Sequence, residues 1–126
     1  MSQTAAPTSH AVVIGAGMGG LAAAAAVSRH VDLVTIVVDD YDPAIDFFVD
    51  VLGFELEDDS PSLTNDGRPK RWVVVRPHGA ETGMVLARAD GDHLRHVVGN
   101  QVAGRVGFFL RVDDFEAAHD RMVNAG

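Results

Sequence analysis

The alternation of apolar and polar residues divides the second part of the chain, residues 31–126, into short strands and helices. Residues 34–38 form an apolar, β-branched run, which predicts a buried strand. An acidic break follows, and apolar residues then recur at helical spacing as far as Gly53. We therefore expect a helix with Asp42 as its N-cap, Pro43 in its first turn and Gly53 just beyond its end. Alternation over residues 54–56 predicts a half-buried strand.

The same reasoning assigns the rest of the second part. Residues 57–70 are polar and contain proline and glycine, so we expect a loop or hairpin connection there. Further strands are predicted at residues 71–76, 83–87 and 106–112, and helices at residues 90–99 and 115–125.

The first part of the chain carries a different pattern. A short apolar strand at residues 11–14 leads into Gly15-Ala16-Gly17-Met18-Gly19-Gly20, which fits G-x-G-x-x-G, and an alanine-rich helix follows. Gly15 would allow the tight turn, Gly17 the approach of a pyrophosphate, and Gly20 the close contact of helix and strand.

This stretch resembles the start of flavin-dependent monooxygenases, a Rossmann-like βα unit. The resemblance implies FAD or NAD(P) binding by Gly15, Gly17 and Gly20. Those proteins place an acidic residue at the end of the second strand. That position falls at Val38 here, and Asp39 is one residue beyond it.

An internal repeat with an offset of 74 residues relates residues 38–44 to residues 112–118. Each copy has an apolar strand, an acidic turn, an aromatic residue and a helix that ends in glycine. Two similar modules within one domain are therefore expected.

Residues 31–126 contain four motifs in a fixed order: VTIVVDDYDPAIDFFVDVLGFEL, RWVVVRP, ETGMVLARA and GRVGFFLRVDDFEAAHDRMVNAG. With these motifs, the span resembles the vicinal oxygen chelate (VOC) superfamily, which contains glyoxalases, bleomycin-resistance proteins and extradiol dioxygenases. The resemblance implies an α+β fold of paired βαβββ modules around a ligand cavity. We expect one complete module and a C-terminally incomplete second one (βα) in a domain at residues 31–126, preceded by the Rossmann-like extension at residues 1–30.

Metal-dependent members of this superfamily hold a divalent ion by histidines on first strands and a glutamate on a last strand. The corresponding positions here are Leu33, Gly107 and Val85, which have no donor atoms for a cation. No metal site is therefore expected. His93 and His96 are three residues apart, but a solvated helix face explains them better.

Large apolar residues on predicted strands are candidates for lining a ligand pocket. They are Trp72, Met84, Phe108 and Phe109. For any single one of them, a place in the core is the competing interpretation.

The composition limits the classes of partner that the chain is expected to bind. The chain has 126 residues, a net charge of −8 and a pI near 5.0, which disfavours nucleic acid and anionic membranes as partners. It has no cysteine, no apolar run of membrane-spanning length and no signal-peptide pattern, so a cytoplasmic location is expected.

Together these observations predict a glyoxalase/bleomycin-resistance-like domain that binds a small molecule. Any enzymatic activity would be that of a lyase or dioxygenase relative, and no catalytic residue is identified. A flavin- or nicotinamide-nucleotide-binding fragment and an inactive or structural chimera are the alternatives. A homodimer is expected, because the strand at residues 106–112 would otherwise have an unpaired edge.

Overall fold

The computed structural model describes residues 30–126. The chain divides into two units, Met1–Asp32 and Leu33–Gly126, and the fold below is that of the second unit. The predicted Rossmann-like βα extension, with its strand at residues 11–14 and its glycine motif, lies outside the described residues. The domain boundary at residue 30 therefore stays a prediction.

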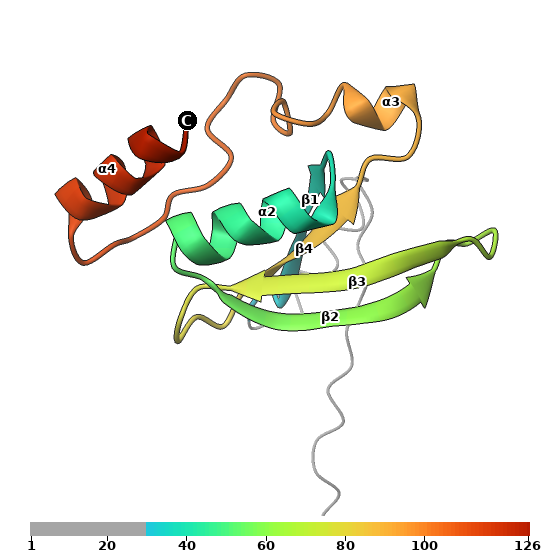
Figure 1. The fold of residues 1–126 in the computed structure, drawn as a ribbon, viewed down its shortest axis with the longest axis horizontal. Coiled ribbons are helices and arrows are strands. Elements are labelled where there is room, and N and C mark those ends of the chain that lie inside the picture. Colours follow the sequence, from blue (N-terminus) through green and yellow to red (C-terminus); the bar gives the residue numbers. More distant parts are fainter. Residues whose placement is uncertain (1–29) are drawn as a thin grey trace, which may run out of the picture. The chain divides into compact units, whose positions relative to one another are not determined.

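A mixed sheet forms the centre of the described unit (Figure 1). Its strands, β1 (Leu33–Val38), β2 (Glu55–Leu63), β3 (Pro69–Arg76) and β4 (Gly83–Arg88), are arranged in the order β1-β4-β3-β2. β1 pairs with β4 in parallel, and the other two pairings are antiparallel. This α+β architecture agrees with one βαβββ module.

A helix follows β1 and covers one face of the sheet (Figure 1). It begins as α2 (Tyr41–Asp46) and continues as the π-helical segment η1 (Phe47–Val51). Asp40, not Asp42 as predicted, is the N-cap, and its carboxylate accepts a bond of 2.8 Å from the Tyr41 N–H. Asp40 has the extended backbone that an N-cap needs, whereas Asp42 already lies in the first turn. Gly53 ends the helix as predicted, with a positive φ of 76°.

The core lies between this helix and the sheet. Alternate residues of the strands point to the helix face, and Phe54 closes the core next to Phe48, with ring centroids 5.4 Å apart. The buried cluster consists of Ile36, Val38, Tyr41, Phe54, Val73, Val75 and Leu86. Apolar runs at strand and helix periods on two facing elements account for this core.

The connection at residues 57–70 is a hairpin, one of the two predicted forms, and a loop over this whole range is wrong. β2 runs on to Leu63, and β3 already begins at Pro69. Polar residues and Pro61 are tolerated because β2 is an edge strand, where one side of the backbone faces no neighbour in the sheet. The acids of β2 are exposed along this edge, where their charges discourage pairing with another strand.

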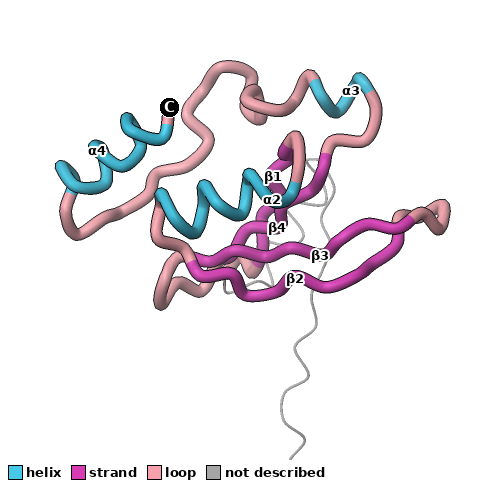
Figure 2. The backbone as a smooth tube through the Cα atoms, in the orientation of Figure 1, coloured by secondary structure: helices cyan, strands magenta, loops and turns pink. Residues whose placement is uncertain are grey.

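The segment after β4 differs from the prediction in two places. The helix predicted at residues 90–99 is reduced to α3 (Asp92–Arg95), and residues 106–112 form no strand. Figure 2 shows loop between α3 and α4. The predicted strand fails because no strand among the described residues pairs with it. Among the described residues, the Gln101 amide bonds both the N–H and the carbonyl of Val37 on β1.

The last helix, α4 (Phe115–Ala125), has the predicted bounds. The Asp114 carboxylate accepts a bond of 3.0 Å from the Ala117 N–H and caps it. Arg121 Nε donates to the carbonyl oxygen of Val51 at 3.0 Å, which links α4 to η1. Among the described helices, none is long and apolar enough to cross a membrane.

Candidate functional site

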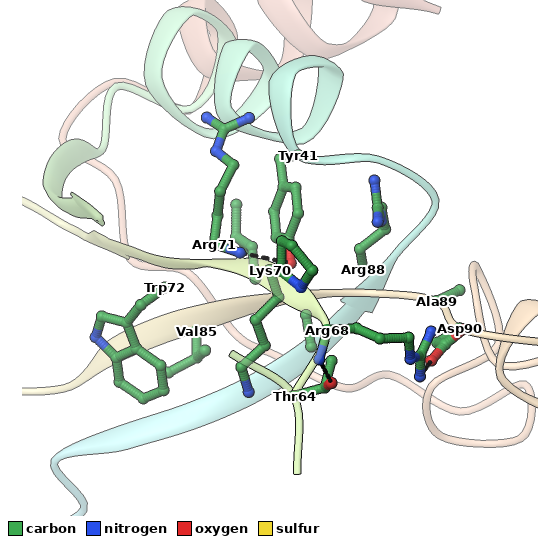
Figure 3. Close-up of a pocket in the computed structure, with 13 residues that line it drawn as sticks. Tyr41, Thr64, Arg68, Lys70, Arg71, Trp72, Val85, Arg88, Ala89 and Asp90 are labelled. Carbon is green, nitrogen blue, oxygen red and sulfur yellow. Dashed lines mark hydrogen bonds and ion pairs between the residues drawn. The ribbon is translucent and has the colours of Figure 1, made fainter. Parts of the chain in front are cut away.

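The sheet opens between β3 and β4. These strands are paired only at Val74–Val85 and Val75–Met84 in the described sheet, whereas β1–β4 and β2–β3 are paired along most of their lengths. Beyond the paired residues the two strands diverge. A hollow of about 240 Å³ lies where they separate, lined mainly by residues 68–72 and 85–90, with Tyr41 and Thr64 (Figure 3). We call it the β3–β4 hollow.

Tyr41 closes the helix side of the β3–β4 hollow. It is buried, and its hydroxyl accepts a bond of 3.3 Å from the Arg71 backbone N–H. The phenol therefore satisfies a donor that a neighbouring strand would otherwise satisfy. The guanidinium carbons of Arg71 and Arg88 lie 5.0 Å and 5.5 Å from the centre of the Tyr41 ring, so two cations border its π-system (Figure 3).

Two of the arginines at the hollow are engaged by carboxylates. Arg71 bonds Asp59 on β2 and, at 2.8 Å, Asp42 on α2. The hydrogen bond from Arg71 lowers the pKa of Asp59, so this carboxylate stays ionised.

Arg68 is held in the same way by Asp66 and Asp90. Hydrogen bonds from Thr64 and Arg68 lower the pKa of Asp66, and the bond from Arg68 lowers that of Asp90. Asp90 is the only acidic side chain among the described residues that line the hollow, and Arg68 already binds it.

The candidate pocket residues are distributed over different environments. Trp72 lines the β3–β4 hollow with 38% of its surface exposed. Met84 packs against the core, and Phe109 is 93% exposed. Phe108 lines a second hollow of about 230 Å³ formed by residues around Gln101. That these four residues contact a ligand stays a prediction.

The nucleotide-binding candidates are not brought together within the described residues. Asp39 is exposed directly after β1, and Gly15, Gly17 and Gly20 lie outside the described part of the chain.

The three positions that correspond to metal ligands in relatives lie on different elements. Leu33 begins β1, Val85 is buried on β4, and Gly107 lies in the loop before α4. Across residues 30–126 there is no group of three or more histidine, cysteine, aspartate or glutamate side chains that could hold a metal ion. His93 lies on α3, and His96 follows its end.

The residues of the hollow that were not singled out from the sequence include Tyr41 and the four cations Arg68, Lys70, Arg71 and Arg88. Strand alternation from Trp72 could have pointed to Lys70, which lies on the same face of β3. The roles of Tyr41 and Arg88 depend on the divergence of β3 from β4, and no local pattern indicates that divergence.

The order of strands and helices, with a hollow between two diverging strands of the sheet, defines a small α+β module. The sequence model of the Glyoxalase/Bleomycin resistance protein/Dioxygenase superfamily matches residues 30–126. The chain therefore belongs to this superfamily, as its motifs indicated.

Solved structures of similar fold include two proteins from Streptomyces sp. CB03234. The antibiotic binding protein TnmS3 is 34% identical, with a TM-score of 0.59 over 79% of this chain and 73% of that one. A glyoxalase/bleomycin resistance protein is 32% identical, with a TM-score of 0.53 over 77% and 75%. UcmS2 is 29% identical, with a TM-score of 0.58 over 79% and 77%.

A sequence relative is an uncharacterized protein of Shewanella frigidimarina (strain NCIMB 400). It is 44% identical over 90 residues, which are 71% of this chain and 64% of the relative. The chain thus matches less than two thirds of the length of that relative.

Proposed function

We propose that this glyoxalase/bleomycin-resistance-like domain binds a small organic molecule, an antibiotic or a compound of similar size, without a resident metal ion. The observation that carries the proposal is the 34% identity and common fold with an antibiotic binding protein over 79% of the chain. The β3–β4 hollow supplies a concave surface with an aromatic side chain, and the positions of the superfamily's metal ligands carry Leu33, Val85 and Gly107.

The size of the hollow fits part of such a ligand. Its volume of about 240 Å³ is slightly below the roughly 300–1,000 Å³ typical of ligand pockets. We therefore expect one ring system of the ligand to enter the β3–β4 hollow while the rest of the molecule remains outside it.

Titration of the full chain with bleomycin and with antibiotics of other chemical classes tests this function. Trp72 is the only tryptophan of the chain, so its fluorescence reports directly on the hollow. We expect at least one compound to quench Trp72 with a micromolar or lower Kd that EDTA does not change. Absence of binding across the panel by calorimetry, or binding that EDTA abolishes, would contradict the proposal.

We also propose that the chain acts as a homodimer in the cytoplasm. Support for the dimer comes from the 106–112 segment, where Val106, Phe108, Phe109 and Leu110 are exposed without a neighbouring strand among the described residues. Support for the location comes from the absence of cysteine in the sequence.

Flavin binding by the glycine motif remains the alternative, and the motif at residues 15–20 lies outside the part matched by the superfamily. The visible absorption band of a bound flavin in the purified protein, lost in a Gly17→Ala variant, would favour that alternative.

A further inference from the structure

The chain has one lysine, one tyrosine and one tryptophan, and all three line the β3–β4 hollow. The hollow also contains Arg68, Arg71 and Arg88, so four of the ten lysine and arginine residues of an otherwise acidic chain gather there. Carboxylates already bind Arg68 and Arg71, which leaves Lys70 and Arg88 as the cations of the hollow without a salt bridge among the described residues.

Lys70 and Trp72 form one face of the β3–β4 hollow. They are two residues apart on β3, so their side chains point to the same side of the sheet, opposite to Arg71 and the Tyr41 ring. Val85 and Ala87 of β4 extend this face with apolar side chains. Figure 3 shows Lys70 and Trp72 directed away from the helix that carries Tyr41.

The ammonium group of Lys70 has no acidic partner among the described residues. Asp90, the carboxylate that lines the hollow, is bound by Arg68, and Asp59 on β2 is bound by Arg71. Lys70 is nevertheless half-buried. A half-buried cation without a counterion, beside an accessible indole, is suited to a ligand that brings its own negative charge.

We propose that the β3–β4 hollow binds a planar aromatic anion, a ring that carries a carboxylate or an ionised phenol. The ring lies against Trp72, Val85 and Ala87, and the anionic group accepts a hydrogen bond from the Lys70 ammonium. This assignment rests on the proposed small-molecule binding and adds the charge and shape of the ligand. Because the whole chain repels anions, Lys70 confers the preference for them locally.

Two probes of nearly the same shape separate charge from shape: 2-naphthoate, which is anionic, and 2-naphthamide, which is neutral. Quenching of Trp72 measures the Kd of each for the full chain. We expect 2-naphthoate to bind about tenfold more tightly or better, the ratio that a charge-assisted hydrogen bond gives.

Three variants assign that ratio to Lys70. Lys70→Met keeps the apolar stem and should reduce the ratio to about 1, whereas Lys70→Arg should retain a preference for the anion. Arg95→Met removes an exposed positive charge on α3, outside the β3–β4 hollow, and should leave the ratio unchanged.

The outcomes separate this proposal from the broader one. Equal affinity for the two probes in the wild type, or an undiminished ratio in Lys70→Met, overturns the anion assignment while small-molecule binding stands. If neither probe quenches Trp72 but an antibiotic of the panel does, the anion assignment is again wrong and the broader function holds. If neither the probes nor the panel bind, both proposals fail.

Discussion

The single residue Arg71 connects three elements around the β3–β4 hollow. Its guanidinium bonds Asp59 on β2 and Asp42 on α2, and its backbone N–H donates to the Tyr41 hydroxyl. Exposed ion pairs contribute only about 0–1 kcal/mol each. The contribution of Arg71 is therefore geometric: it fixes the start of α2 relative to the middle of β2 and the start of β3.

At the same scale, the ion pair between His78 and Glu55 predicts a pH effect. Glu55 Oε1 lies 2.7 Å from His78 Nδ1, and this hydrogen bond raises the pKa of His78 above its ordinary value of 6.5. We expect Glu55→Gln to lower the pKa of His78, measured by NMR titration of the imidazole protons. An unchanged pKa in that variant would contradict the pairing.

The sign of the stability effect follows from the direction of that shift. The folded state binds the imidazole proton more tightly than the unfolded state. The pair therefore stabilises the fold below pH 6.5, and its contribution is lost as the pH rises through the folded pKa of His78. Because His78 is fully exposed, the effect on the free energy of unfolding should be small.

Single residues also predict that the chain lacks the metal site of the superfamily. Leu33, Val85 and Gly107 have no donor atoms, so calorimetric titration with Zn²⁺, Ni²⁺ and Mn²⁺ should show no submicromolar site. His93 and His96 are the control. Submicromolar binding that persists when both are changed to glutamine would show that another set of ligands exists.

At the scale of elements, apolar periodicity predicted the centre of the fold and failed at its edges. β1 was predicted from its apolar, β-branched run, and the helix after it and α4 were predicted from the pattern of their apolar residues along the sequence. β2 was missed beyond Leu56 because both its faces are polar. Its pairing is imposed by β3, with Ser60 opposite Trp72 and Pro61 opposite Arg71.

The 106–112 segment shows the opposite error. Its apolar residues and its match to β1 in the internal repeat predicted a strand, but a strand exists only where a neighbour bonds it. Of the candidate site, the sequence indicated Trp72, because a large apolar residue on a predicted strand can be recognised locally. The hollow beside Trp72 depends on where β3 and β4 separate, and strand pairing is not visible in the local sequence.

A substitution pair tests the core at this scale. The Leu86 side chain on β4 is 0% exposed, so Leu86→Ala should reduce the free energy of unfolding by about 2–5 kcal/mol. Leu63 on β2 is 62% exposed, so Leu63→Ala should change it by only about 0.5 kcal/mol or less. Urea denaturation followed by circular dichroism measures both. Equal losses of the free energy of unfolding in the two variants would show that Leu86 is not part of the core.

At the scale of the whole molecule, the main feature of the surface is the set of exposed apolar residues on and before the C-terminal helix. Val106, Phe109, Phe115 and Val123 are each more than half exposed. Large apolar side chains with such exposure are typical of surfaces that another chain covers. A second copy is the partner we propose, because a two-fold dimer covers the same residues on both chains.

Light scattering at micromolar concentration tests the dimer. We expect the wild type to have twice the mass of one chain, and Phe109→Lys to shift it towards monomer, because an ammonium group would be buried in the interface. Arg111→Lys, two residues away, keeps its charge and serves as the control. A monodisperse wild-type monomer would contradict the proposed dimer.

The short pairing between β3 and β4 has a consequence for how such a domain can change. Two ribbons, β1–β4 and β2–β3, are each paired along most of their lengths, with one irregularity between Leu56 and Asp58 on β2, and they meet along two residue pairs. The width of the gap beyond that junction depends on side chains such as Tyr41 and Trp72, not on the ladders themselves. Substitutions there can therefore retune which molecules fit while the backbone hydrogen bonds of the sheet remain intact, so ligand preference can diverge without loss of the fold.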